Sequence, residues 1–238
     1  MKHRWNTNHY EKYTSKLWRT ELNKLYPSES WVLYRTALKS KNCLDIGCGN
    51  GAMSQIIKKI NQRCKYVGVD HQENLIKNAN KIFKSSKFIF SDVNNFILSH
   101  KKKYDLVMAW SVIKSFENWR QIIDFMIQSS KKYVVFDQRV TNFKGIYFDK
   151  KILQATYGNI SGPLLCIDYK SLKKHFYKYK DKISKIEIMA YKSDWGRNVK
   201  FYKNSTTYVA TFLIQLKTKK EKKNEIEIYE QLPLCLKK

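Results

Sequence analysis

Apolar and polar positions alternate in blocks along the middle of the chain. Short apolar runs are separated by longer stretches in which apolar residues recur at helical spacing, the pattern of βαβ units that build a parallel sheet. This pattern predicts helices near residues 51–61, 72–84 and 117–130. The strands that it predicts span residues 43–46, 66–69, 88–90, 106–110 and 133–136.

The two flanks of this core follow other patterns. Apolar residues between positions 8 and 39 are spaced as in helices, and residues 27–30 interrupt them, which predicts two helices before the sheet. Beyond Gln138 we expect an irregular stretch to about residue 167 and a helix over 169–178. Two further strands, 183–191 and 207–216, are expected to form an edge pair joined through residues 193–206. We expect the tail from Lys217 to be surface structure or partly disordered.

Length and composition limit the class of protein. The 238 residues fit one domain with a single core, and the apolar runs are too short to span a bilayer. The N-terminus has no apolar signal-peptide core, so we expect a cytoplasmic protein without membrane insertion. The five cysteines form no CxxC pair, so we expect neither a disulfide framework nor a metal site.

The formal charge of +26 raises the question of a polyanionic partner. Only seven of the 46 basic residues are arginine, the residue favoured for forked contacts to phosphates and bases. A solvated lysine surface is therefore the leading interpretation. RNA remains the alternative partner.

A glycine-rich turn follows the first predicted strand. Asp45 ends the strand, and Gly47, Gly49 and Gly51 come at every second position before a helix, with Cys48 as a small residue inside the loop. Glycines let the backbone turn sharply and let a ligand approach where no Cβ stands in the way. The loop therefore predicts the binding of a nucleotide-type cofactor.

The glycines alone leave the ligand open. Gly47, Gly49 and Ala52 also fit the dinucleotide fingerprint G-x-G-x-x-G/A, so an oxidoreductase is a rival interpretation. The next strand ends in Asp70, 19 residues after Gly51, where a carboxylate can accept hydrogen bonds from both ribose hydroxyls. The following strand ends in Ser91 and Asp92, whose carboxylate can accept from an adenine amine or cap a helix.

These segments together resemble class I S-adenosylmethionine-dependent methyltransferases across about residues 42–138. The carriers are the acid-x-Gly-x-Gly-x-Gly loop, the two acids at the ends of the second and third strands, and a fourth strand that Trp110 and Ser111 close. The resemblance implies an α/β, Rossmann-like, mostly parallel seven-stranded sheet. It also implies an antiparallel C-terminal strand, helices on both faces and extra N-terminal helices.

The resemblance further implies the cofactor and its contacts. Asp70 would bind the ribose, His71 would lie beside the adenine, and Asp92 would accept from the adenine amine. The full set of expected contacts to S-adenosylmethionine is Asp45, Gly47, Cys48, Gly49, Gly51, Asp70, His71, Ser91, Asp92, Val93 and Trp110.

The acceptor is less clearly indicated. An oxygen acceptor usually needs a base near the carboxyl ends of the fourth and fifth strands. Asp137 and Ser111 are the candidate catalytic residues there, with His175 as a further candidate from a loop, although an ion pair of Asp137 with Arg139 or Lys131 is the plainer interpretation. The loop 193–198 ranks first for acceptor contacts.

Taken together, the sequence predicts a single methyltransferase domain over residues 1–238. Its parts are a helical cap (1–40), a cofactor-binding core (42–138), an acceptor-side region with the last two strands (139–216) and a basic tail (217–238). The expected activity is methylation, on oxygen, of a small molecule or glycan precursor. The alternatives are an RNA methyltransferase and a non-catalytic cofactor-binding scaffold, and the oligomeric state is left open.

Overall fold

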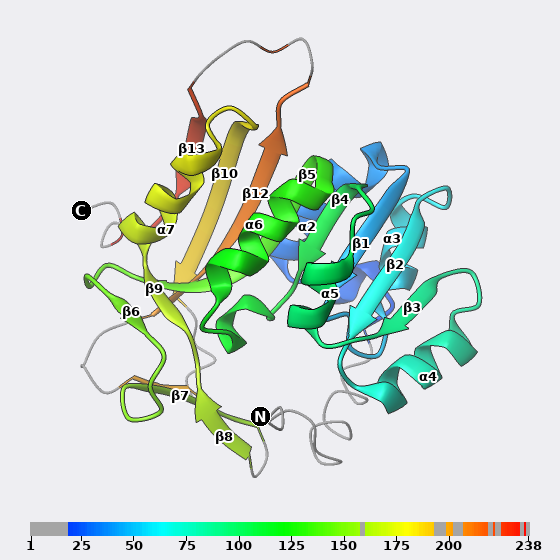
Figure 1. The fold of residues 1–238 in the computed structure, drawn as a ribbon, viewed down its shortest axis with the longest axis horizontal. Coiled ribbons are helices and arrows are strands. Elements are labelled where there is room, and N and C mark those ends of the chain that lie inside the picture. The colour runs from blue at the N-terminus through cyan, green and yellow to red at the C-terminus, as the bar shows by residue number, and fades with distance from the viewer. Residues whose placement is uncertain are drawn as a thin grey trace.

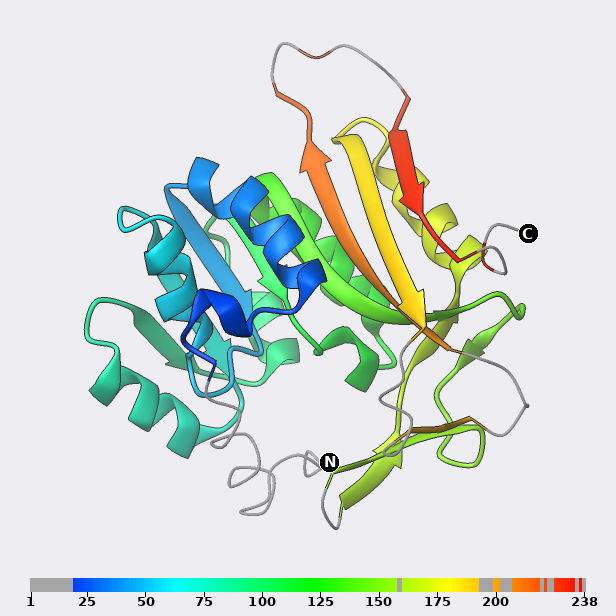
Figure 2. The same ribbon diagram turned by 180° about the vertical axis from the view of Figure 1, so that it is seen from behind.

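A large β-sheet covered on both faces by helices forms the body of the molecule (Figure 1, and from behind in Figure 2). The computed structural model describes residues 19–157, 160–192, 199–201, 207–218, 221, 225–233 and 236. The strands in the first half of the sheet are β1 (Asn42–Ile46), β2 (Lys65–Asp70), β3 (Lys87–Phe90), β4 (Tyr104–Ala109) and β5 (Ser130–Thr141).

These five strands run parallel in the order β3-β2-β1-β4-β5. Next to them, β12 (Tyr208–Leu216) lies antiparallel between β5 and β10 (Ile183–Lys192). The resulting seven-strand order confirms the predicted Rossmann-like class. Because the chain leaves β1 toward β2 and later returns through β4 on the other side, the switch point where such sheets bind ligands lies between β1 and β4.

The far side of the sheet differs from the expectation. The last two predicted strands are not an edge pair, because β12 is internal and β10 is covered by β13 (Glu227–Gln231), a parallel strand from the tail. Residues of β12 are buried almost without interruption, as expected of a strand with neighbours on both sides. The strand β9 (Cys166–Asp168) pairs with the end of β5, and β6 (Ile146–Tyr147) pairs with β9. With these two strands the sheet has ten strands among the described residues.

In the part of the chain that the structure describes, three helices pack on each face of the sheet. On one face lie α2 (Pro27–Thr36), α3 (Met53–Ile60) and α4 (Glu73–Ile82). On the other lie α5 (Val93–Ser99), α6 (Trp119–Ser129) and α7 (Tyr169–Phe176). The helices α3, α4, α6 and α7 confirm predictions, whereas α5 follows β3 in a segment for which no helix was predicted. Short 3₁₀ turns complete the set: η1 (Leu22–Lys24), η2 (Ala37–Lys39), η3 (Ile113–Ser115) and η4 (Tyr177–Tyr179).

The N-terminal region also differs from the prediction. Pro27 does not interrupt a helix but begins α2, since the first turn of a helix needs no N–H from the residue at that position. Before α2, the described residues contain only the turn η1. The first expected helix was to begin near residue 8, and its residues 8–18 lie outside the described residues.

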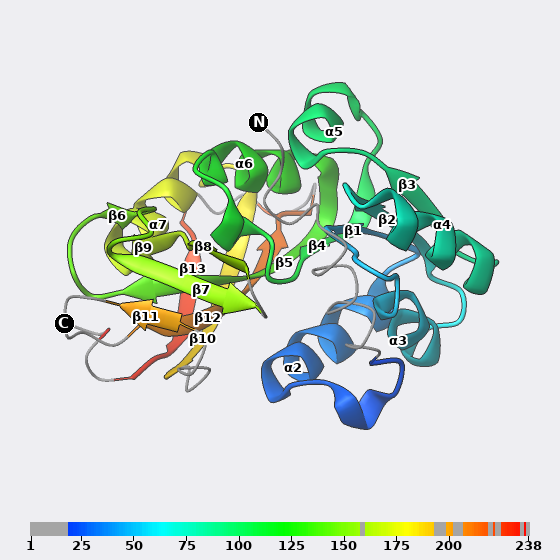
Figure 3. The ribbon, with the colours of Figure 1, turned by 90° about the horizontal axis from the view of Figure 1, so that it is seen from below.

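A second, smaller sheet replaces much of the irregular stretch that was expected up to residue 167. It consists of β7 (Leu153–Tyr157), β8 (Ile160–Pro163) and β11 (Val199–Phe201), in the order β11-β7-β8. It lies beyond the carboxyl end of β5 (Figures 1 and 3). Within the described parts of the chain, no helix has the length and apolar character needed to cross a membrane.

Candidate functional site

The loop between β1 and α3 is built on three glycines in the left-handed backbone region. The φ angles of Gly47, Gly49 and Gly51 are 71°, 54° and 78°. A Cβ at Gly47 would collide with the Val112 side chain, whereas a Cβ at Gly49 would have no atom within 4 Å. Gly49 therefore faces open space, as a loop that lets a ligand approach its backbone must do.

Asp70 fastens this loop to the end of β2. Its carboxylate accepts hydrogen bonds from the N–H of Gly49 at 2.9 Å and from the N–H of Gln72 at 3.0 Å, through different oxygens. A carboxylate has about four acceptor positions, so these two bonds leave capacity for hydroxyl groups of a ligand. His71 follows with its Nδ1 3.3 Å from the Asp70 carboxylate. The structure therefore brings the predicted ribose ligand and the glycine loop together.

The end of β3 joins the same corner. The N–H of Ser91 donates to the carbonyl of Asp70 at 2.9 Å, and Val93 is buried beneath the turn. Asp92 is the N-cap of α5, because its carboxylate accepts from the N–H of Asn94 at 2.8 Å. The capping interpretation of Asp92 is thus confirmed, and its contact with an adenine amine stays a prediction.

Trp110 gives a further indication that a ligand binds in this corner. It follows β4 and packs against the core on the α2–α3 face. Its indole Nε1 is buried and has no hydrogen-bond partner among the described residues. A buried N–H normally has a partner, so this donor suits a polar group of a bound molecule. With the open approach at Gly49 and the carboxylate of Asp70, these residues fit S-adenosylmethionine.

Cys48 fills space under the loop. It is buried against Gly68 of β2, where an added Cβ would collide with the cysteine side chain. Burial, followed by the nearby carboxylates of Asp70 and Asp45, raises the pKa of the Cys48 thiol well above its ordinary value. A thiol held neutral in this way is a packing group and a poor nucleophile. No sequence pattern indicates that position 68 requires glycine, because the requirement depends on how the loop packs against the neighbouring strand.

Asp45 lies beneath the loop in a contact that sequence reasoning missed. Its carboxylate is 2% exposed and accepts a hydrogen bond from the phenol of Tyr66 on β2. Burial raises the pKa of Asp45 to about 7, against the lowering effect of the Tyr66 hydrogen bond, and the charge of Asp70 adds to the rise. Its expected contact with the cofactor stays a prediction.

We expect Asp45→Asn to change how stability depends on pH. The Asp45 pKa is higher in the folded protein than its ordinary value of 3.8, so its contribution is fully present below that value and is lost as the pH rises through 7. The loss is on the order of 4 kcal/mol between pH 4 and pH 8. Urea unfolding at both pH values measures it, and the asparagine variant should show a smaller decline. Equal declines in the two proteins would contradict the assignment.

Ser111 and Asp137 meet where β4 and β5 end. Ser111 has a φ of 58°, the one positive φ among described non-glycine residues. Its backbone N–H donates to one carboxylate oxygen of Asp137, and its Oγ lies 3.4 Å from the other. A residue in this backbone region is strained and persists because its surroundings hold it there, which is common at functional sites. The two candidate catalytic residues are therefore in direct contact.

His175 does not belong to this site. The prediction placed it on a loop, but it lies in α7 and is 3% exposed. Its Nε2 is 2.6 Å from the Asp124 carboxylate of α6, and its ring packs against Trp119. Its spacing with Leu172 and Phe176 places it on the buried face of the helix, so it is a core residue. The loop 193–198, ranked first for acceptor contacts, lies outside the described residues.

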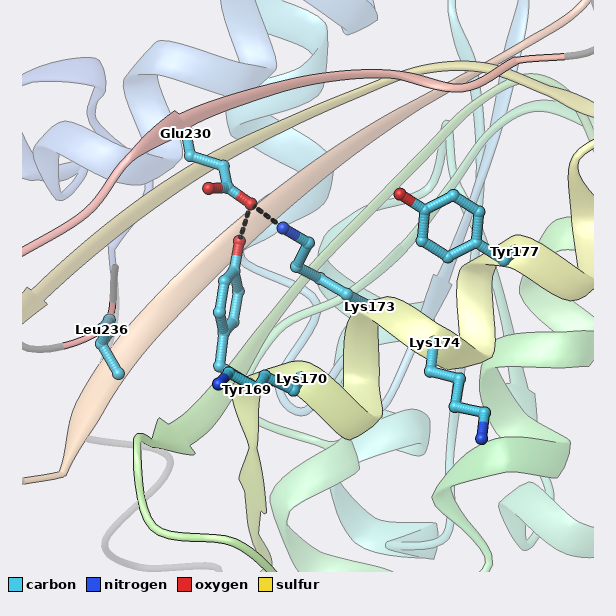
Figure 4. Close-up of a pocket in the computed structure, with 7 residues that line it drawn as sticks. All are labelled: Tyr169, Lys170, Lys173, Lys174, Tyr177, Glu230 and Leu236. Carbon is cyan, nitrogen blue, oxygen red and sulfur yellow. Dashed lines mark hydrogen bonds and ion pairs between the residues drawn. The ribbon is translucent and has the colours of Figure 1, made fainter. Parts of the chain in front are cut away.

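A cavity of about 330 Å³ lies away from this corner, between α7 and the edge strand β13 (Figure 4). Lysines and tyrosines of α7 and η4 line it, and Glu230 of β13 occupies its upper side. The Glu230 carboxylate accepts from the phenol of Tyr169 at 2.8 Å and from the ammonium of Lys173 at 2.5 Å. These bonds join the edge strand to the helix, so the groove has a structural role.

Comparison with known proteins gives matches to methyltransferases. Residues 37–152 match the family described as "Methyltransferase domain". A curated relative, the "Putative methyltransferase 235L" of Invertebrate iridescent virus 6, is 30% identical over 108 residues, which are 43% of this chain and 40% of that protein. The chain thus matches less than half of the relative's length.

Several solved structures share the fold. The plantazolicin methyltransferase BpumL, solved with SAH and a desmethylPZN analogue, is 16% identical with a TM-score of 0.57, over 90% of this chain and 93% of that one. The N-terminal domain of EvdMO1, solved in the presence of SAH and D-fucose, is 10% identical with a TM-score of 0.61, over 89% and 100%. The O-methyltransferase of a Brevibacillus brevis trans-AT PKS multienzyme is 16% identical with a TM-score of 0.51, over 68% and 55%.

Proposed function

We propose that this chain, whose residues 37–152 are a methyltransferase domain of the class I, Rossmann-like family, methylates an oxygen atom of a small molecule or glycan precursor with S-adenosylmethionine as donor. The observation that carries the proposal is the corner formed by the glycine loop, Asp70 and Trp110. There the backbone at Gly49 is open, a carboxylate has acceptor positions to spare, and a buried indole N–H lacks a partner among the described residues.

The residues of this corner divide the work of holding the cofactor. Asp70 accepts hydrogen bonds from two ribose hydroxyls while it keeps the loop in place through Gly49. Asp92 and Val93 take the adenine side, with His71 next to them, and Trp110 donates its N–H from the end of β4. When bound, S-adenosylmethionine supplies an electrophilic methyl carbon on a sulfonium. Its position next to β4 would bring the acceptor to Ser111 and Asp137.

Asp137 has the role of a base or hydroxyl ligand in this proposal. Its carboxylate holds Ser111 through the backbone N–H and stays half-buried at the carboxyl edge, where an acceptor hydroxyl can reach it. Positioning of the acceptor and exclusion of water supply the other part of the rate enhancement. The O-methyltransferase among the proteins of similar fold supports oxygen as the acceptor atom.

Two alternative functions are compatible with the same fold. The charge of +26 favours an RNA acceptor, and the fold alone would also suit a scaffold that binds the cofactor without catalysis. Both alternatives share the cofactor corner with the main proposal. They differ from it in what receives the methyl group.

Two measurements test the proposal. Titration calorimetry should show binding of S-adenosylmethionine and none of NADH, and the reverse result would favour the dinucleotide interpretation. Incubation with methyl-labelled cofactor should then transfer label to the small-molecule or glycan fraction of a cell extract. Label in RNA alone would support the RNA methyltransferase, and cofactor binding without label in any fraction would support the scaffold.

A further inference from the structure

The face of the sheet that α2 covers carries a polar cluster at its carboxyl edge. Val135 of β5 packs in the same core cluster as Val32 and Leu33 of α2. Because side chains alternate along a strand, Asp137 and Arg139 lie on this face too. An ion pair of 2.7 Å between Arg35 and Glu187 also joins α2 to β10 on this face.

Strand register places further polar groups beside them. Arg139 is paired with Val209 of β12, and Val209 is paired with Tyr191 of β10, so the three residues form one row across the sheet. In the next row, Asp137 is paired with Thr211. Residues paired in this way share a face, so charged and hydroxyl-bearing side chains from three strands meet at the edge where the acceptor is expected.

Arg139 is the cation of this cluster. Its side chain is 7% exposed, and its Nη1 donates to the hydroxyl of Thr207 at 3.0 Å. The phenol of Tyr191 lies within hydrogen-bonding reach of Ser28 at the start of α2, and the charges of Asp137, Glu29 and Arg139 all act on it. A phenol is a neutral donor at physiological pH, and burial raises the pKa of Tyr191 further above its ordinary value. The neighbouring Glu29 is neutralised by Arg19, at 2.8 and 2.9 Å.

Thr211 gives an independent sign of a ligand. It is 1% exposed, and its Oγ1 has no hydrogen-bond partner among the described residues. Buried hydroxyls normally have a partner, and the register of β12 places this one directly opposite Asp137. An acceptor molecule that contacts Asp137 would therefore lie next to the Thr211 hydroxyl.

We propose that Arg139 and Tyr191 bind an anionic group of the acceptor, a carboxylate or a phosphate, and so present its nucleophilic atom to Asp137 and Ser111. The inference rests on the proposed methyl transfer and names its substrate class. A planar guanidinium recognises both anions through paired hydrogen bonds, and a phenol adds a third donor. The anionic group stays unmethylated, and the methyl group goes to a separate oxygen near Asp137.

The order of the residues along β5 supports this arrangement. Asp137 follows Phe136, which is paired with Ala109, the last residue of β4, and is therefore close to the expected methyl donor, whereas Arg139 lies two residues further out along β5. Two residues of a strand span about 6.5 Å, a distance that one small molecule can bridge. The hydrogen bond to Thr207 orients the guanidinium of Arg139.

The test separates the acceptors by charge before the reaction. A macromolecule-free cell extract is divided on an anion exchanger at pH 7, and each part is incubated with the full-length protein and methyl-labelled cofactor. The retained part should take up the label, and phosphatase treatment of that part distinguishes phosphate from carboxylate. Label with the unretained part alone would overturn the inference and leave methyl transfer standing. No label in either part would count against the proposed small-molecule function as well.

Variants then assign the anion to Arg139. With the retained part as substrate, Arg139→Met should raise the apparent KM by a factor on the order of 10 to 100, as loss of charge-assisted hydrogen bonds does, with little change in kcat. Arg139→Lys should restore part of the affinity, and Tyr191→Phe should give a smaller loss. Binding of S-adenosylmethionine by calorimetry should be unchanged in all three, which shows that they fold. An unchanged KM in Arg139→Met would overturn the inference.

Discussion

Replacement of Asp70 by alanine should weaken the binding of S-adenosylmethionine by about 100-fold or more. Two effects add. The variant loses the carboxylate that would accept from both ribose hydroxyls, and it also releases the N–H of Gly49, which Asp70 holds at 2.9 Å. A hydrogen bond to a charged group contributes about 1.5 to 3 kcal/mol, so the loss of two already gives this factor. Titration calorimetry with the purified chain measures it.

Glu73→Gln is the matched control for this variant. Glu73 is an exposed carboxylate three residues further along, in the first turn of α4, where it pairs with Lys77. Its loss should leave cofactor affinity within about twofold, since exposed pairs contribute little. Asp70→Asn should fall between the two, because the amide oxygen can still accept one hydrogen bond. Equal affinities in Asp70→Ala and the native protein would remove the ribose role.

The arrangement of the proposed cofactor corner could be predicted because each of its parts is local in sequence. The glycines, Asp70 and Asp92 all stand at the end of a strand in a regular βαβ order, and parallel strands bring their carboxyl ends to one edge. The helix-capping role of Asp92 was readable in the same way. What the local pattern could not show is that Asp45 is tied to Tyr66, because that contact depends on how β1 and β2 pack beneath the loop.

The acceptor side was less predictable because its parts come from distant segments. The register of β5, β12 and β10 places Arg139 and Tyr191 in one row, and the packing of α2 brings Ser28 within hydrogen-bonding reach of Tyr191. The position of β12 inside the sheet decides that register, and the apolar alternation of its sequence did not distinguish an internal strand from an edge. The strand β13 was not predicted because it is short, carries two glutamates, and shows only a weak alternation of apolar and polar residues.

Replacement of Asp137 by asparagine should lower kcat by about 100-fold or more, the contribution typical of a general base, while cofactor affinity is retained. The amide oxygen can still accept the N–H of Ser111, so the strained backbone there keeps its support and the variant isolates the loss of proton acceptance. The measurement is the rate of label transfer to the acceptor fraction at saturating cofactor. The defect should narrow as the pH rises, because an acceptor hydroxyl that ionises in solution needs no base.

The comparison with Asp137→Ala separates the two roles of this residue. Alanine removes the support for Ser111 as well as the base, so it should lower kcat further and also weaken cofactor binding next to β4. Asp181→Asn, an exposed change between η4 and β10, should leave both quantities unchanged. If Asp137→Asn kept full turnover and only Asp137→Ala lost it, the carboxylate would be a positioning residue for Ser111, and catalysis would rest on alignment of the acceptor alone.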